Sequence, residues 1–225
     1  MAGKRVCIIG AGISGLITAK VMRDDGFEVV VFEKASAIGG VWEGTRTYLG
    51  LRANNPRETY EFSEFPYPKS ADDYPTAAQV RDYLDSFVET FELRPLIRIS
   101  SEVLAVSRTK GEKGRHGFHV SVRSDREGAA AEEHDFDFVV VCNGVFSVPH
   151  IPDLEGSEQF AGGTLHSSEF LVPQVVTGKR VVVIGGGKSA IDCASFATRS
   201  AKICTLNFLS PPWVLPTFFA ESPVL

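Results

Sequence analysis

The chain has 225 residues, of which 44% are hydrophobic and 23% charged, and its net charge at pH 7 is −5. This composition is that of an ordinary globular protein, and the length allows one or two domains with a sizeable core. The negative charge gives no electrostatic reason to expect nucleic acid or an anionic membrane as a partner. No apolar run approaches the length of a membrane span, and Gly10 interrupts the first one, so neither a membrane segment nor a signal peptide is expected.

The cysteines indicate the redox setting. Cys7, Cys142, Cys193 and Cys204 form no CxxC pair, and none is spaced from a histidine as metal ligands are. We therefore expect four buried, reduced thiols in a cytoplasmic protein and no metal site. A disulfide reductase would need a close cysteine pair, so that class is excluded. His116 and His119 form an HxxH pattern, but no further ligand completes a metal set, and the pattern is typical of a solvated loop.

The first 33 residues predict a β-α-β unit. Arg5–Ile9 is a continuous apolar run that favours a buried parallel strand, and a glycine-rich turn follows it. The next elements expected are a helix over Leu16–Asp25, closed by Gly26, and a strand over Glu28–Glu33. A long irregular segment, 34–75, is rich in glycine, proline and asparagine, and segments of this length inside a domain are usually functional.

The central part of the chain predicts one helix and several strands. Thr76–Phe91 has apolar residues on one face, as an amphipathic helix does. Leu96–Arg108 and Phe118–Arg123 are predicted to form antiparallel strands around a polar tip, Lys110–Gly117. A solvated loop, Asp125–His134, and a buried strand, Phe136–Cys142, are expected to follow.

The sequence contains an internal repeat. The segment from Lys4 to Gly12 resembles the segment from Lys179 to Gly187, and each is followed by a helix and a second apolar strand that, in the later copy, runs to Asn207. The predicted fold is therefore α/β with two Rossmann-like dinucleotide-binding units. We predict a first nucleotide-binding domain in residues 1–150 and a second that begins in residues 151–225.

The first glycine loop, 10–15, has the GxGxxG pattern between a strand and a helix, which is the context that a dinucleotide site requires. The first glycine permits a tight turn, the second lets the backbone approach a pyrophosphate, and the third allows close helix–sheet packing. Glu33 is placed to accept hydrogen bonds from ribose hydroxyls, and its charge would repel a 2′-phosphate, so FAD or NAD fits. The segment Gly39–Trp42 resembles one seen in flavoproteins and favours FAD, although core packing alone would also explain Trp42. The predicted FAD-binding residues are Gly10, Gly12, Ser14, Gly15, Glu33, Lys34, Gly40, Val41, Trp42 and Asn54.

The second glycine loop, 185–190, has the pattern GxGxxA, in which alanine still allows close packing. A P-loop is excluded because Val182 stands where that motif needs glycine. Asn207 is predicted to occupy the place that Glu33 has in the first copy, and without a carboxylate there NADPH is accepted as well as NADH. The residues predicted to bind the second nucleotide are Gly185, Gly187, Lys188, Ser189, Ala190 and Asn207.

Further motifs resemble the flavin-containing monooxygenase family. The segment from Phe160 to Phe170 matches the pattern FxGxxxHxxxF, a fingerprint of that family, and it differs from the Baeyer–Villiger version by ending in Phe170. The segments Leu51–Arg57 and Phe62–Pro66 are similar to family elements as well. The resemblance covers essentially this whole chain but only the N-terminal portion of a typical member. Leu209 stands where members commonly have an arginine that contacts the 2′-phosphate.

The resemblance implies a flavoenzyme with an FAD domain and the start of an inserted NAD(P)H domain. In such enzymes NADPH reduces FAD, and NADH is the alternative donor for this chain. A C4a-hydroperoxyflavin then transfers one oxygen atom from O₂ to a nitrogen or sulfur nucleophile. Asn54 corresponds to an active-site asparagine of the family, although it could simply nucleate a turn with Asn55. His166 is expected to be structural, linking the two domains.

Three other functions remain open from the sequence. The chain could be an FAD-binding subunit without catalysis, an NAD(P)H oxidase that makes hydrogen peroxide, or a Baeyer–Villiger-type oxygenase. The incomplete second nucleotide domain predicts a second polypeptide or a homo-oligomer that covers its exposed edge.

Overall fold

The computed structural model describes residues 3–110, 116–125, 130–210, 217–219 and 222–223. The chain divides into two compact units, one built from residues 1–43 and 81–147 and the other from 44–80 and 148–225. The irregular segment that follows the first β-α-β unit thus belongs largely with the second unit. The predicted assignment of FAD to residues 1–150 and NAD(P)H to residues 151–225 concerns binding and stays a prediction.

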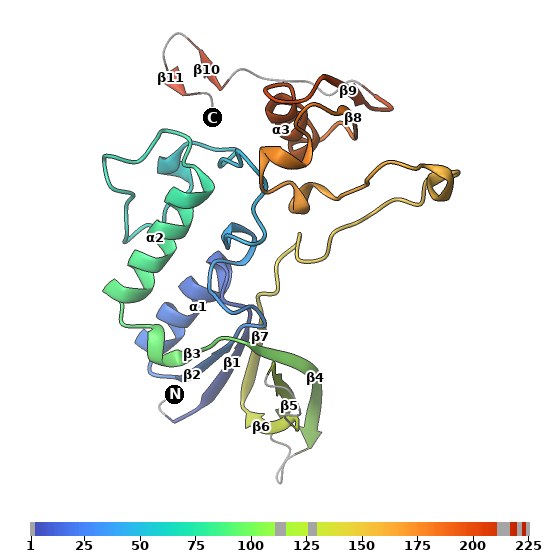
Figure 1. Cartoon of the computed structure of the whole chain (residues 1–225). Helices are drawn as coiled ribbons and strands as arrows, with labels where there is room; N and C mark the ends of the chain where they lie inside the picture. Colours follow the sequence, from blue (N-terminus) through green and yellow to red (C-terminus); the bar gives the residue numbers. More distant parts are fainter. Residues whose placement is uncertain (1–2, 111–115, 126–129, 211–216, 220–221, 224–225) are drawn as a thin grey trace. The chain divides into compact units, whose positions relative to one another are not determined.

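A parallel sheet forms the centre of the first unit (Figure 1), in the order β3-β2-β1-β7. Its strands are β1 (Arg5–Ile9), β2 (Glu28–Phe32), β3 (Ile97–Arg98) and β7 (Phe138–Val141). The predicted strands at β1 and β2 are confirmed with small shifts at their ends. Two strand predictions are wrong in part. The segment Leu96–Arg108, expected as one antiparallel strand, is divided, because Ile97–Arg98 pairs in parallel with β2 and the antiparallel strand begins only at Ser101. Phe136, expected in the last parallel strand, lies in a separate antiparallel strand.

Helix α1 (Ile13–Asp24) packs against β1 and β2 through its buried residues Gly15, Leu16 and Ala19. It begins three residues earlier than expected, because the end of the glycine loop already forms its first turn. Helix α2 (Ala77–Thr90) is amphipathic as predicted, with Val80, Tyr83, Leu84, Phe87 and Val88 all buried. The guanidinium of Arg23 near the end of α1 donates to the carbonyl of Phe91, just after α2.

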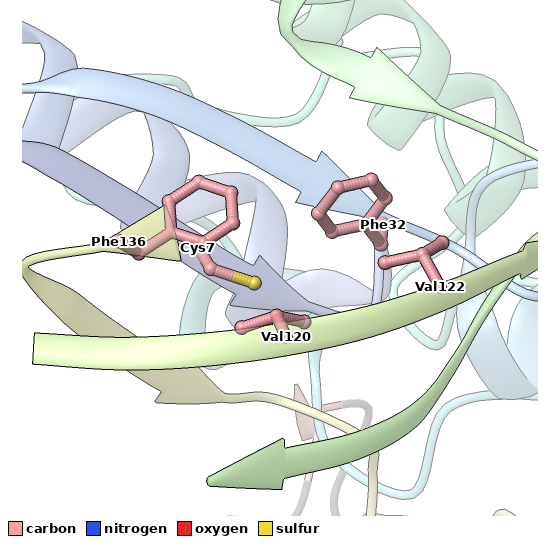
Figure 2. Close-up of a cluster of buried hydrophobic side chains, with 5 residues drawn as sticks. All are labelled: Cys7, Phe32, Val120, Val122 and Phe136. Carbon is pink, nitrogen blue, oxygen red and sulfur yellow. The ribbon is translucent and has the colours of Figure 1, made fainter. Parts of the chain in front are cut away.

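A three-stranded antiparallel sheet, β4 (Ser101–Lys110), β5 (His116–Ser124) and β6 (Glu132–Phe136), packs on part of the parallel sheet. The cluster Cys7, Phe32, Val120, Val122 and Phe136 fills the space between them (Figure 2). Strand β6 corrects the expected loop over Asp125–His134, because Glu132–Phe136 pairs along β5 despite its polar sequence. The predicted polar tip Lys110–Gly117 is wrong at both ends, because Lys110 ends β4 and β5 begins at His116, so that the HxxH pattern lies in a strand and not in a loop. Residues 111–115 of that tip and 126–129 of the loop lie outside the described residues.

The second unit contains the repeat. Strands β8 (Arg180–Ile184) and β9 (Ile203–Asn207) pair in parallel, and α3 (Lys188–Ala197) connects them, as predicted. One face of this pair packs against α3 and a core of Tyr48, Phe170, Val176, Cys193 and Ala197. A short hairpin, β10 (Phe218–Phe219) with β11 (Ser222–Pro223), lies near the end of the chain.

Short 3₁₀ helices occur in the irregular segments: η1 (Gly40–Trp42), η2 (Arg57–Thr59), η3 (Arg94–Leu96), η5 (Ser157–Gln159), η6 (Ser167–Glu169) and η7 (Pro173–Val175).

All four cysteines are free thiols, although Cys142 and Cys204 are only half-buried. Within the described residues, no helix has both the length and the apolar character needed to cross a bilayer.

Candidate nucleotide-binding site

Two glycines of the first loop are required by packing alone. Gly10 has φ +104°, and a Cβ there would lie 2.5 Å from the carbonyl oxygen of Cys142 at the end of β7. A Cβ on Gly15 would lie 1.8 Å from the carbonyl oxygen of Gly10. No side chain fits at either position, so the tight turn and the close helix–sheet packing predicted from the motif are present.

Gly12 differs from its neighbours because protein packing does not exclude a side chain there. Its φ is −80°, and an added Cβ would sit at an ordinary van der Waals distance, 3.6 Å, from Cα of Gly40. Gly12 is the N-cap of α1, which has no side-chain cap and no acidic residue in its first turn. The first N–H groups of α1 therefore have no side-chain acceptor, and such a terminus attracts phosphate. Ser14 lies in this turn and is exposed.

Glu33 holds the first loop in shape. Its side chain is 6% exposed, and its two carboxylate oxygens accept hydrogen bonds from the backbone N–H groups of Ala11, at 2.7 Å, and Ala35, at 2.8 Å. The structure thus places the predicted ribose acceptor against the glycine loop and gives it a structural role that the sequence did not reveal. The next residue, Lys34, is exposed and lines a shallow cavity of about 270 Å³ with Ser100 and Arg123.

The segment Gly39–Trp42 lies directly on the first loop. The N–H of Gly39 donates to the carbonyl of Ala11 at 2.9 Å, and a Cβ on Gly40 would approach Cα of Gly12 to 3.2 Å. Trp42 is buried and Val41 half-buried. The structure therefore brings together the glycine loop, Glu33 and the 40–42 turn. The sequence linked Glu33 to the loop by motif spacing and the turn only by resemblance.

The second loop repeats this geometry. Gly185 has φ +137°, and a Cβ there would lie 3.3 Å from Cβ of Ala190. Gly187 is the N-cap of α3, again without a side-chain cap or an acidic residue in the first turn. A Cβ on Gly187 would meet no atom within 4 Å, so open space faces this backbone.

The strand register corrects one predicted equivalence. Ile9 pairs with Phe32 in the first unit, and Ile184 pairs with Asn207 in the second. Gly10 and Gly185 likewise donate their N–H groups to the carbonyls of Phe32 and Asn207. Asn207 is thus the counterpart of Phe32, and Phe208 is the counterpart of Glu33. The prediction erred by one residue, but the conclusion that no carboxylate stands there is unchanged.

Polar side chains at the start of α3 form a network. The ammonium of Lys188 pairs with Oδ2 of Asp192, and the hydroxyl of Tyr48 donates to the same oxygen at 2.9 Å. Burial raises the pKa of the Tyr48 phenol well above its usual value. The sequence singled out Lys188 and Ser189 but missed Tyr48, which lies 144 residues from Asp192.

Asn54 is exposed in the second unit. Its backbone neighbourhood is fixed, because the N–H of Ala53 donates to the carbonyl of Pro75 at 2.8 Å. The guanidinium of Arg52 donates to Asp72, at 2.6 Å, and to the carbonyl of Tyr74. This ion pair lowers the pKa of the Asp72 carboxyl. A catalytic role for Asn54 stays a prediction.

The two histidine motifs have local structural roles. His166 caps η6, because its Nδ1 accepts from the Ser168 N–H while Glu169 accepts from the His166 N–H at 2.6 Å. His119 lies between Asp135 and Glu133 on the antiparallel sheet. Among the residues that the structure describes, no cluster is suited to hold a metal ion.

Two glycine loops, each at the carboxyl end of a parallel strand and each opening an uncapped helix, define a dinucleotide-binding protein of the Rossmann class. The family model described as "Flavin-binding monooxygenase-like" matches residues 3–222, so the chain belongs to that family. This confirms the resemblance inferred from the motifs.

The chain is similar to several characterised proteins. It is 33% identical to dimethylaniline monooxygenase [N-oxide-forming] 2 of Cavia porcellus, over 94% of this chain and 41% of that protein. Its fold matches that of S-allyl-L-cysteine S-oxygenase from Allium sativum with a TM-score of 0.81 and 28% identity, over 97% and 54% of the two chains. It also matches an oxidized steroid monooxygenase bound to NADP, with a TM-score of 0.71 and 32% identity, over 89% and 38%. The chain spans about half the length of the curated relatives that it matches or less.

Proposed function

We propose that this chain supplies the FAD-binding part and the start of the NAD(P)H-binding part of a flavin-dependent monooxygenase. The enzyme would use NAD(P)H and O₂ to transfer one oxygen atom to a soft nitrogen or sulfur nucleophile, and the second oxygen atom would leave as water. The observation that carries this proposal is the presence of two equivalent glycine loops in a chain of this family. Each loop opens a helix whose N-terminus has no side-chain cap.

The residues present fit both cofactors. Gly12 and Gly187 leave backbone accessible where a pyrophosphate would approach, and neither has an acidic neighbour in the helix turn that follows. FAD would be held by the first loop, Glu33, Lys34 and the 40–42 turn, and the nicotinamide dinucleotide by the second loop. When bound, FAD supplies the electron transfer and oxygen activation that amino-acid side chains cannot. NADPH is our preferred donor because Phe208 offers no carboxylate to repel a 2′-phosphate.

Asn54 is proposed to act at the reacting centre. Its amide can donate one hydrogen bond and accept another, and its side chain is exposed on a segment whose backbone is held by Ala53 and Arg52. A donor placed in this way stabilises developing negative charge, and removing such a donor typically lowers the rate about 10²-fold or more. The soft nucleophile is proposed because two relatives are named for N-oxide formation and S-oxygenation.

We also propose that further polypeptide, either more of the same chain or a separate subunit, completes the second unit. Val182, Ile184 and Ile203 are 62%, 58% and 54% exposed on the face of β8–β9 opposite α3. Parallel sheets are normally covered on both faces. Among the described residues β8 pairs only with β9. In the first unit β1 also pairs with β7, and the carbonyl of Cys142, the residue after β7, lies against Gly10. Light scattering that shows this chain as a stable, flavin-loaded monomer would count against the proposal.

A cytoplasmic location is proposed on separate grounds. All four cysteines are unpaired, and burial raises the pKa of the Cys7 thiol to about 12 and that of Cys193 to about 11. Free, unreactive thiols are typical of proteins from reducing compartments.

The reaction is tested with the FAD-loaded protein together with the polypeptide that completes its second unit, NADPH, ¹⁸O₂ and one of three probes: N,N-dimethylaniline, a dialkyl sulfide or a cyclic ketone. We expect ¹⁸O in the amine or sulfide product, together with matching NADPH consumption. Absence of flavin reduction would indicate a non-catalytic subunit. Formation of as much hydrogen peroxide as NADPH consumed would indicate an oxidase. Formation of an ester from the ketone, with no oxidation of the amine or sulfide, would indicate a Baeyer–Villiger enzyme. Each of these three results contradicts the proposal.

The matched variants are Asn54→Ala and Asn55→Ala, which remove neighbouring exposed amides. Asn54→Ala is expected to divert most of the O₂ to hydrogen peroxide and to lower product formation about 10²-fold. In Asn55→Ala, product formation should still match NADPH consumption. Equal behaviour of the two variants would remove Asn54 from the proposed chemistry.

A further inference from the structure

The hydroxyl of Tyr48 is linked to the start of α3 through Asp192. It donates to Oδ2 of Asp192, and the same oxygen accepts from the ammonium of Lys188. Lys188 is the first residue of α3 and directly follows Gly187. The buried phenol is therefore joined through one carboxylate to the lysine that follows the second glycine loop.

Tyr48 is held in place independently of its hydroxyl. The next residue, Leu49, donates its N–H to the carbonyl of Phe170 at 2.8 Å. Gly50 has φ +80°, and the ring of Phe196 on α3 lies 1.9 Å from where its Cβ would be. The guanidinium of Arg199 stacks on the Phe196 ring, 4.1 Å from the ring centroid. These contacts fix the backbone around Tyr48, so the loss of its hydroxyl should leave the ring seated.

The Lys188–Asp192 pair alone would be a weak constraint. It is an i,i+4 pair whose lysine side chain is 43% exposed, and such pairs contribute little because both side chains remain mobile. A hydrogen bond from a 9% exposed tyrosine fixes the position of the carboxylate. Lys188 is then held before any ligand arrives, which lowers the entropy cost of binding an anion.

We propose that Tyr48 is a positioning residue of the second glycine loop, holding Lys188 through Asp192 in the arrangement that a nicotinamide dinucleotide meets. The inference rests on the proposed function, because it assumes that this loop binds NADPH. Tyr48 itself need not touch the dinucleotide.

The test compares Tyr48→Phe with a matched control, Tyr74→Phe, in the FAD-loaded protein. Both changes remove the hydroxyl of a buried tyrosine in the second unit, and that of Tyr74 donates to the carbonyl of Thr217, which is not part of α3. Tyr48→Phe is expected to weaken NADPH binding in calorimetric titration about fivefold. It should also speed amide hydrogen exchange over 187–191, and the control should change neither measurement.

A kinetic measurement separates positioning from general damage. Flavin reduction at saturating NADPH should stay within about twofold of the unaltered protein, while the half-saturating NADPH concentration rises about fivefold. Unchanged affinity in Tyr48→Phe, when the unaltered protein binds NADPH, would overturn the inference and leave the proposed function standing. Failure of the unaltered FAD-loaded protein to bind NADPH would overturn both.

Discussion

The carboxylate of Glu33 accepts a hydrogen bond of 2.7 Å from the backbone N–H of Ala11, in the middle of the first glycine loop. The carbonyl of Ala11 accepts a second hydrogen bond, from the N–H of Gly39. The glycine loop is thus fixed between the end of β2 and the 39–42 turn. Glu33 therefore fixes the conformation of the glycine loop in addition to placing a carboxylate beside it.

The two hydrogen bonds of Glu33 predict the effect of Glu33→Gln. An amide has one acceptor oxygen, so the N–H of either Ala11 or Ala35 loses its partner. We expect a loss of about 1–3 kcal/mol in the free energy of unfolding, measured by urea denaturation, and reduced FAD content. Glu28→Gln is the control, because Glu28 lies on the same strand in an exposed pair with Arg5 and should change stability by less than about 0.5 kcal/mol. Equal losses would refute the structural role of Glu33.

Gly12→Ala and Gly15→Ala should fail in different ways. The Cβ at Gly12 meets only an ordinary contact, so the protein should fold with a loss of about 1 kcal/mol or less and yet bind FAD poorly. The Cβ at Gly15 would overlap the Gly10 carbonyl, and unfolding of the variant is expected, with a cost of more than about 3 kcal/mol. Circular dichroism and FAD content distinguish the two. A Gly12→Ala protein with full FAD content would show that no pyrophosphate approaches this position.

Gly187→Ala tests the second loop alone. The new methyl group would meet no protein atom within 4 Å and the φ of −82° suits alanine, so FAD content and melting temperature should change little. Affinity for NADPH should fall at least about tenfold, because the methyl group occupies space that the dinucleotide needs. Gly163→Ala, at a position that is equally open, is the control and should bind NADPH normally.

His119 gives a pH prediction. Its hydrogen bond to Asp135 and the charges of Asp135 and Glu133 raise its pKa above the usual value. Since the pKa is higher in the folded protein, the stabilisation is fully present below about pH 6.5 and is lost as the pH rises through the folded value. Imidazole NMR titration should show the raised pKa, and Asp135→Asn should lower it. Glu102→Gln, which affects the pair with Arg123 on the same sheet, should leave it unchanged.

Local sequence patterns predicted the β-α-β units well. The apolar runs before Gly10 and Gly185 are strands of two separate parallel sheets, and a helix follows each loop. These features depend on neighbours within about 30 residues. The family motifs predicted the class because they reflect the same local geometry.

The errors come from features that local patterns do not encode. Strand β6 has the sequence EEHDF, which is more typical of a solvated loop, and it forms because β5 offers it a pairing edge. The equivalence of Asn207 and Glu33 failed by one residue, since strand ends are set by pairing register and not by composition. The contact of Tyr48 with Asp192 spans 144 residues and leaves no spacing signal in the sequence.

We propose above all that the two loops hold two different dinucleotides and that electrons pass from one to the other. The most direct measurement is the visible flavin absorbance of the FAD-loaded protein as NADPH is added without oxygen and air is then admitted. We predict that NADPH bleaches the flavin band, that air restores it, and that Gly187→Ala slows bleaching at low NADPH. An FAD-loaded protein whose absorbance does not respond to NADPH would contradict the account.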